Sequence, residues 1–327
     1  MASLFASSSN AAGVLEADLT AVEERLSALL DSNESQIGEI CHYLVDGSGK
    51  RLRPTFIMLV YRACGGDDGA RRDAVDAATA LELIHSATLL HDDIIDAGVL
   101  RRGRPSAYAR YGMAPTLVAG DYLFCRAFEI CGRFDEPLVL TAARACIQLT
   151  EGEAMEGRLR FNAGASLDDY LAVITRKTAS LFAAGGKVAA DLAGAPPTLG
   201  DAMSRLGNAV GLAFQMVDDL LDILGPEEKI GKPVGSDLRA GIPSLPMVLA
   251  AEHNPGLRAM FRNGASHDDA VFRRALDLLR APEVIERARA MAADQVQRAR
   301  ALLAELPPSA YRDRLSIVID EQVRREV

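Results

Sequence analysis

Two short stretches of this sequence decide its fold: residues 91–96, HDDIID, and residues 217–222, VDDLLD. In each stretch, three aspartates stand at positions i, i+1 and i+4, and apolar residues fill the positions between them. Successive residues of an α-helix are about 100° apart, so positions i and i+4 lie one above the other on the same face. Each stretch therefore predicts a helix that presents three carboxylates to one side.

The carboxylates of the two aspartate clusters need cationic partners. Like charges at i and i+4 destabilise a helix, and unpaired charge beside Leu, Ile and Val is costly. Mg²⁺ relieves both effects because it binds one or two carboxylates together with phosphate oxygens. Two such clusters favour a magnesium site for a phosphorylated substrate over two solvated patches. Three acidic pairs lack the third aspartate and are interpreted as helix caps or surface groups: Asp67–Asp68, Asp168–Asp169 and Asp268–Asp269.

The composition favours an all-α fold. Apolar residues make up 49% of the 327 residues, aromatic residues only 5%, and Trp is absent, so the core must consist mainly of Ala, Leu, Val and Ile. Because no stretch alternates polar and apolar residues between turn signals, no sheet is predicted. We expect one domain over residues 1–327, with a flexible segment at 1–13. The principal predicted helices span about 15–29, 72–96, 115–132, 137–160, 167–195, 200–224, 243–253, 269–304 and 309–325.

Charge and cysteine content exclude several classes of protein. The net charge is −9 and no basic stripe dominates any segment, so a nucleic-acid partner is not expected. No apolar run reaches the roughly 20 residues of a spanning helix, and the N-terminus lacks the pattern of a secretory signal, which predicts a soluble cytoplasmic protein without stable membrane insertion. Five cysteines without C-x-x-C spacing predict free thiols in a reducing compartment: Cys41, Cys64, Cys125, Cys131 and Cys146.

Basic residues gather at several helix ends. Residues 47–54, GSGKRLRP, follow a glycine turn, and their Lys50 and Arg53 are three apart, so they share a helix face that can grip one phosphate group. This stretch is not a P-loop, because Arg follows the lysine and no strand precedes it. His85 lies two turns before Asp92 on nearly the same face. Cations in separate places are what two diphosphates require, one bound through metal ions and the other through basic side chains alone.

The motifs together resemble those of the trans-prenyl diphosphate synthases, and the resemblance runs from about Leu15 to the C-terminus. It implies the type I isoprenoid synthase fold, a bundle of long helices around a deep central cavity, assembled as a homodimer through helices near 115–132. The motifs are GSGKRLRP (47–54), ELIHSATLLHDDIIDAGVLRRGRPSA (82–107), GDYLF (120–124), RKTASLF (176–182), GLAFQMVDDLLDILG (211–225) and GKPVGSDLRAGIPSLP (231–246).

The resemblance also assigns roles to individual residues. The expected metal ligands, for two or three Mg²⁺ ions that Mn²⁺ can replace, are Asp92, Asp96 and Asp218. The aspartates expected to act through water or neighbouring groups are Asp93, Asp219 and Asp222. The residues expected to bind isopentenyl diphosphate are Lys50, Arg53, His85 and Arg102. Those expected at the allylic diphosphate are Arg101, Lys177, Thr178, Gln215 and Lys232. The catalytic set implied is Lys177, Thr178, Gln215, Asp92 and Asp218.

The implied reaction is the Mg²⁺-dependent head-to-tail condensation of isopentenyl diphosphate with an allylic diphosphate, farnesyl or geranylgeranyl. Small side chains at Ala87 and Thr88, where the family places aromatics to stop growth, predict a medium or long product of about C30 to C50 for quinone side chains. A short-chain synthase, a catalytic subunit of a heteromeric synthase and a class I terpene cyclase are the alternatives. Ile242 replaces a lysine common in the family, and Arg239 is the candidate to take over its phosphate contact.

Overall fold

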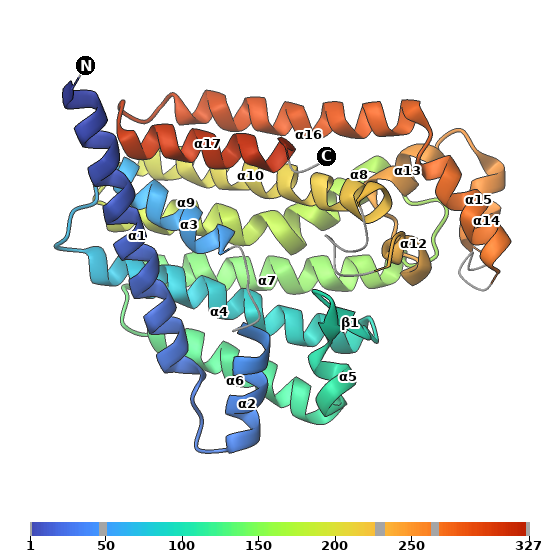
Figure 1. Ribbon diagram of the computed structural model, residues 1–327, viewed down its shortest axis with the longest axis horizontal. Coiled ribbons are helices and arrows are strands. Elements are labelled where there is room, and N and C mark those ends of the chain that lie inside the picture. Colours follow the sequence, from blue (N-terminus) through green and yellow to red (C-terminus); the bar gives the residue numbers. More distant parts are fainter. Residues whose placement is uncertain (1, 46–50, 226–232, 263–267, 325–327) are drawn as a thin grey trace.

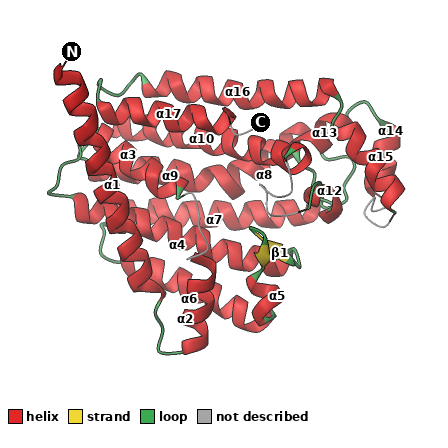
Figure 2. Ribbon diagram, viewed as in Figure 1, coloured by secondary structure: helices red, strands yellow, loops and turns green. Residues whose placement is uncertain are grey.

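The computed structural model describes residues 2–45, 51–225, 233–262 and 268–324, with side chains described from residue 11 to residue 321 of these ranges. Two residues predicted to bind diphosphate, Lys50 and Lys232, lie outside the described residues. The all-α prediction is confirmed, because helices make up nearly the whole described chain (Figure 2).

The helices follow one another with short connections. The elements up to the middle of the chain are α1 (Ala2–Leu30), α2 (Ser35–Val45), α3 (Leu52–Ala63), α4 (Arg71–Ile95), β1 (Leu100–Arg101), β2 (Arg104–Pro105), α5 (Ala107–Tyr111), α6 (Met113–Cys131) and α7 (Glu136–Leu159). The remaining elements are α8 (Leu167–Ile174), the π-helix η1 (Thr175–Ala179), α9 (Ser180–Leu192), α10 (Pro197–Leu224), α12 (Ser236–Ala240), α13 (Leu245–Ala251), α14 (Pro255–Arg262), α15 (Asp269–Leu279), α16 (Pro282–Leu303) and α17 (Ala310–Arg324).

Long helices form the centre of the molecule. In Figure 1, α4, α7, α9, α10, α16 and α17 run along the long axis, α1 crosses them at one end, and α14 and α15 cover the other. Helix α10 packs against both α9 and α16, and α4 packs against α6. Gly207 of α10 permits the closest of these contacts, since a Cβ there would lie 2.1 Å from the carbonyl oxygen of Phe182. The bundle thus places α4 and α10, which carry the two aspartate clusters, among its inner helices.

Helix α1 follows the predicted apolar stripe. Leu15, Val22, Leu26 and Leu29 are all buried against the bundle, as expected from their spacing of three and four residues. The helix begins at Ala2, inside the segment for which we expected flexibility, and that expectation stays a prediction.

Two apolar clusters fill the interior. One joins α1, α3, α4, α6 and α9 to the first half of α10, and the other joins the second half of α10 to α8 and the helices from α13 to α16. No helix in the described part of the chain is both long and apolar enough to cross a bilayer.

The acidic pairs interpreted as caps or surface groups have those roles. Ser166 and Asp169 form a reciprocal capping box at the start of α8, and Asp268 caps α15 by accepting from the backbone of Ala270. Asp68 instead pairs with Arg62, with 2.9 Å between the charged atoms.

The structure corrects two expectations about secondary structure. A two-stranded hairpin joins α4 to α5, and its tight turn holds Arg102 and Gly103 at φ of 53° and 75°, the backbone that a two-residue hairpin requires. Strands of two residues are too short to show alternation, which is why none was predicted. The helix predicted over 269–304 is interrupted before Pro282, which begins α16 because proline suits the first turn of a helix.

Candidate active site

The first aspartate cluster occupies the last turn of α4 and the residue that follows it. Asp92 is half-buried, and within the described residues its carboxylate accepts no hydrogen bond and forms no ion pair. Burial raises the pKa of Asp92 to about 7, although the positive charge of Lys177 opposes this shift. Asp96 is more exposed and pairs with Arg160, which follows α7. Asp92 is therefore a carboxylate that lacks a cation of its own.

Asp93 has a different environment from Asp92. It is buried, and its carboxylate accepts from Arg101 Nε at 2.7 Å and from the backbone N–H of Ala107 at 3.3 Å. Burial raises its pKa, while Arg101 works in the opposite direction. Asp93 thus ties the hairpin and the start of α5 to the end of α4, and so holds Arg101 beside the cluster.

The second cluster lies in the last two turns of α10. Asp219 is buried and accepts from Gln215 Nε2 and from the backbone N–H of Leu245, both at 2.9 Å. Burial raises the pKa of Asp219 to about 6. The hydroxyl of Tyr170 is buried beside Asp219 without a hydrogen bond of good geometry, and burial raises its pKa well above 10. These contacts join α8 and α13 to the cluster.

Asp222 anchors the segment that follows α10. Its carboxylate accepts from Ser236 Oγ at 2.5 Å and from the backbone N–H of Asp237 at 3.2 Å. Its own carbonyl accepts from the backbone N–H of Gly235 at 2.8 Å. The half-buried Asp218 is close enough to Arg53 of α3 to influence the pKa of that guanidinium.

Lys177 sits in the π-helix η1 and contacts α7. Its Nζ lies 2.6 Å from Glu153 Oε2 and 2.6 Å from Glu156 Oε1, and all three side chains are mostly buried. Burial disfavours the charged ammonium, but Glu156, Asp92 and Glu153 outweigh that effect and raise the pKa of Lys177. Gly152 makes the contact possible, because a Cβ there would lie 2.6 Å from the backbone nitrogen of Lys177.

Thr178 continues this network toward the second cluster. Its hydroxyl donates to Gln215 Oε1 at 2.8 Å, and the amide nitrogen of Gln215 donates in turn to Asp219 at 2.9 Å. The consecutive residues Lys177 and Thr178 therefore have different partners. Lys177 pairs with two glutamates of α7 and influences the pKa of Asp92, whereas Thr178 is linked to Asp219 through Gln215. A π-helix whose adjacent residues serve two acidic clusters suits a functional site, because such turns recur where a helix must redirect adjacent side chains.

The described basic residues predicted for the metal-free diphosphate meet around His85. Burial lowers the pKa of His85 well below 6.5, and the positive charges of Arg53, Arg101 and Arg102 lower it further, which places all three nearby. Arg101 is the one of the three that was predicted for the allylic diphosphate. Arg53 lies 5.0 Å above the ring of Phe182, and its Nε is buried without a hydrogen-bond partner. A guanidinium with a buried and unused donor is suited to a bound anion.

The two aspartate clusters fit a metal that substrate helps to bind. Across the described ranges, no three His, Cys, Asp or Glu side chains are close enough together to hold a metal ion by themselves. Mg²⁺ does not require that, since it commonly takes one or two carboxylates and completes its shell with water and phosphate oxygens. Asp92, with no cation or donor of its own, is the carboxylate best suited to this role.

Three functional candidates escaped sequence analysis: Glu153, Glu156 and Arg160. The stretch EGEAMEG at 151–157 carries the signal for the first two, because acids three apart share a helix face. Their partner Lys177 is distant in sequence, so only the fold reveals the pairing. Arg160 gives no local signal.

Three further residues were predicted to be functional, Ala87 and Thr88 for product length and Arg239 for a phosphate contact. Ala87 and Thr88 are buried in α4, and the Thr88 hydroxyl donates to the carbonyl of His85 at 2.7 Å. Arg239 is exposed and stacks over the ring of Phe272 at 3.6 Å. This stacking gives Arg239 a partner on α15, and its proposed phosphate contact stays a prediction.

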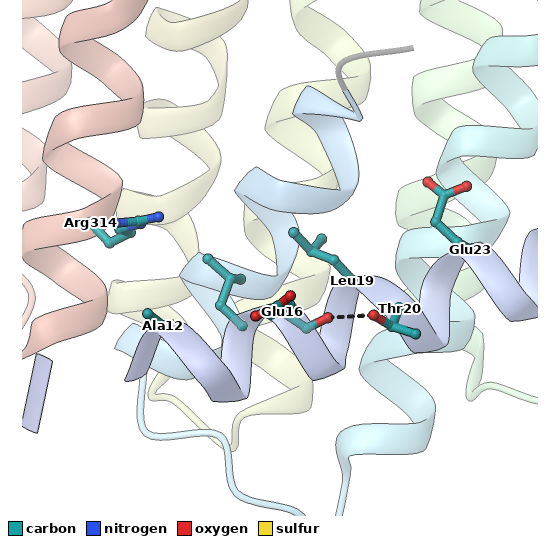
Figure 3. A pocket seen from close by; sticks show the side chains of 7 residues that line it. Ala12, Glu16, Leu19, Thr20, Glu23 and Arg314 are labelled. Atoms are coloured by element: carbon teal, nitrogen blue, oxygen red, sulfur yellow. Dashed lines mark hydrogen bonds between the residues drawn. The ribbon is translucent and has the colours of Figure 1, made fainter. Parts of the chain in front are cut away.

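An open pocket lies along α1 (Figure 3). Residues of α1 and Arg314 of α17 line it, and none of its lining residues belongs to α4 or α10. We therefore do not assign it to the site.

A protein-family model described as polyprenyl synthetase matches residues 34–279 of the chain. The chain belongs to the polyprenyl synthetase family. Among its relatives, component 2 of heptaprenyl diphosphate synthase from Geobacillus stearothermophilus is 36% identical over 91% of this chain and 92% of that protein. Nonaprenyl diphosphate synthase from Mycobacterium tuberculosis is 37% identical over 96% of this chain and 94% of that protein.

A shorter-chain enzyme and a protein of known structure are also similar to this chain. A short chain isoprenyl diphosphate synthase from Methanothermobacter thermautotrophicus is 33% identical over 93% of this chain and 95% of that protein. The crystal structure of a polyprenyl synthase from Caulobacter crescentus, complexed with calcium and isoprenyl diphosphate, has a TM-score of 0.91 and 34% identity and covers 98% of each chain. The predicted membership of the prenyl diphosphate synthases and the predicted isoprenoid synthase fold are thus confirmed.

Proposed function

We propose that this chain is a trans-polyprenyl diphosphate synthase that adds isopentenyl diphosphate, head to tail, to an allylic diphosphate, as one polyprenyl synthetase domain in the cytoplasm. The observation that carries the proposal is the pair of adjacent residues in η1 that serve the two aspartate clusters. Lys177, held by Glu153 and Glu156, is near enough to Asp92 to influence its pKa, and Thr178 is linked to Asp219 through Gln215. A separate basic cluster, formed by Arg53, His85 and Arg102, supplies a second anion site.

The chain's own residues would divide the chemistry between two anions. Mg²⁺ held by Asp92, Asp96 and Asp218 would neutralise the allylic diphosphate and ease its departure, as a bound divalent cation does for a developing phosphate charge. Lys177 would hold the same diphosphate in position. The basic cluster, together with the undescribed Lys50, would orient isopentenyl diphosphate so that its double bond faces C1 of the allylic chain. The apolar residues behind Asp92 would keep water from the cation.

The assay that tests the proposal uses the purified chain alone. Farnesyl diphosphate, radiolabelled isopentenyl diphosphate and Mg²⁺ should give labelled products that elongate with time, and reverse-phase chromatography should show their length. Repeating the assay with Mn²⁺, and with EDTA, tests the metal requirement. Absence of elongation with any allylic primer, together with recovery of activity on adding a second subunit, would establish the heteromeric alternative instead. A cyclised hydrocarbon product would establish the terpene cyclase.

We propose that the product is medium or long, about C30 to C50, because Ala87 and Thr88 leave the wall of α4 unobstructed. The buried position of Ala87 means that a larger side chain there must project among the inner helices. Ala87→Tyr is expected to shorten the main product by several isoprene units, read by chromatography. Ala78→Ser, a small change in the same helix further from Asp92, is the matched control and should leave product length unchanged. An unshortened Ala87→Tyr product would show that another residue sets the limit.

We propose a homodimer that uses the exposed side of α6 and α7. Large apolar side chains on these helices are exposed in the single chain, and apolar surface of this kind can mark a protein–protein interface. They are Met113, Leu117, Val118, Phe128, Leu140 and Ile147. Sedimentation velocity should give twice the chain mass, and Leu117→Arg should give the monomer; an unchanged mass in that variant would place the interface elsewhere.

A further inference from the structure

Arg51 lies near the basic cluster, where burial, together with the positive charge of Arg51, lowers the pKa of His85 and of Arg102, and its backbone has a conformation that few arginines adopt. It is the residue before α3, with φ of 45° and ψ of 39°, in the left-handed region. Non-glycine residues in this region are uncommon and persist where surrounding contacts fix them. Arg51 therefore has a local geometry that its side chain must help to hold.

The side chain of Arg51 joins three separate elements. Its guanidinium donates to Glu23 of α1 at 2.5 and 3.2 Å, to Glu82 of α4 at 3.3 Å, and to the carbonyl of Val45 at the end of α2 at 3.0 Å. Only 18% of the Arg51 side chain and 7% of the Glu82 side chain are exposed. These four hydrogen bonds therefore converge on one planar, fork-shaped group, which is the geometry at which arginine outperforms lysine.

The turn held by Arg51 determines where Arg53 points. Arg53 lies two residues later, in the first turn of α3, with its Nε buried and unpaired above Phe182. Arg53 and Glu82 influence each other's ionisation without forming an ion pair, so Glu82 bonds to Arg51 and leaves Arg53 available. Fixing the turn therefore fixes the free guanidinium.

We propose that Arg51, held by Glu23 and Glu82, is a positioning residue for the metal-free diphosphate site, which it serves by fixing the turn that carries Arg53. This inference rests on the proposed function. In this proposal Arg51 does not itself contact the diphosphate, because four of its five N–H donors are already used by two carboxylates and a carbonyl. Glu23, on the far side of Arg51, contributes to substrate affinity although it is an acid near an anion site; Figure 3 shows it at one end of the α1 pocket.

The sign of the Glu23→Gln effect tests the inference. Simple electrostatics predicts that removing a negative charge near a diphosphate site tightens binding, whereas a positioning role predicts weaker binding. We expect the KM for isopentenyl diphosphate to rise about threefold in Glu23→Gln and about tenfold in Arg51→Gly, in line with typical coupling energies. Glycine tolerates the φ of 45°, so Arg51→Gly removes the side chain without adding backbone strain. The KM for the allylic substrate should change less than about twofold.

A double-mutant cycle separates positioning from direct contact. If Glu23 acts through Arg51, the variant carrying both changes should be no worse than Arg51→Gly alone. Arg25→Gln is the matched control, because Arg25 also links α1 to α4 through Asp76, which keeps its second partner Arg133. That control should leave both KM values unchanged. Isothermal titration with isopentenyl diphosphate in the absence of Mg²⁺ should show the same order of affinities, and thermal melting should show folded protein throughout.

Three results would overturn the inference. They are tighter binding in Glu23→Gln, an additive double mutant, and equal increases in the KM for both substrates. Failure of the proposed function has a different signature, because the unmodified chain would then neither bind isopentenyl diphosphate without metal nor elongate an allylic primer.

Discussion

Asp92→Asn is expected to lower kcat by about 10³-fold, because it removes the unpaired carboxylate of the first cluster and with it a ligand for the ions that neutralise the departing diphosphate. The amide has nearly the same shape, so packing should be preserved. Steady-state kinetics at saturating Mg²⁺ and both substrates measures the loss. Asp168→Asn, an exposed aspartate in the first turn of α8, is the matched control and should leave kcat unchanged.

The same substitution should stabilise the metal-free protein above neutral pH. Burial raises the pKa of Asp92 from 3.8 to about 7, so the folded chain holds that proton more tightly than the unfolded chain. The carboxyl contributes stability below pH 3.8, and that contribution is lost as pH rises toward about 7. Melting in EDTA should therefore show Asp92→Asn above the unmodified chain at pH 8 and level with it below pH 4. A variant that is both inactive and less stable at pH 8 would indicate a disrupted fold, not a lost ligand.

Lys177→Met is expected to reduce kcat by about 10²-fold and to destabilise the fold by about 2 kcal/mol. The loss of activity follows from removing the cation beside Asp92. The loss of stability follows because Glu153 and Glu156 would face each other, mostly buried, without the ammonium that lies 2.6 Å from each. Urea unfolding and steady-state kinetics measure the two effects separately.

Adding Glu153→Gln and Glu156→Gln to Lys177→Met tells the two effects apart. The glutamines carry no charge, so the triple variant should regain most of the stability while its kcat stays low. If kcat recovered along with stability, Lys177 would serve the fold and not the substrate. If kcat instead stays low, as expected, Lys177 acts on the diphosphate, and Glu153 and Glu156 hold Lys177 in place.

Most of the fold could be predicted because its signals are local. The stripe of α1 and the apolar length of α4 follow from spacing alone, and the ends of α10 were placed within a few residues. The hairpin after α4 and the π-turn at Thr175–Ala179 were missed, since each depends on the conformation of only a few residues. The interruption at Pro282 has a local signal, because proline suits the first turn of a helix and disrupts a helix interior.

The site could be predicted only in part, for a related reason. Three carboxylates on one helix face are a local pattern, so both aspartate clusters were recognised from sequence. The network of Lys177 with Glu153, and the link from Arg51 to Glu23, join residues that are distant in the chain. The periodicity of residues along the sequence does not reveal such pairs. Arg239 was proposed to replace the missing lysine at position 242 because it is close in sequence. Its stacking on Phe272 could not be predicted in that way, and its phosphate contact stays a prediction.

The π-helix η1 makes the site sensitive to the deletion of a single codon. A short π-helix such as η1 is equivalent to an α-helix with one residue inserted. The segment after it is therefore rotated by about 100° relative to an uninterrupted α-helix. Deleting the codon of Thr175 or Arg176 is therefore expected to convert η1 into ordinary α-helix and to turn Lys177 and Thr178 away from their separate partners, although both side chains remain in the chain. In this enzyme the deletion of one residue from η1 is thus expected to have the same effect on the site as removing the side chains of Lys177 and Thr178 together.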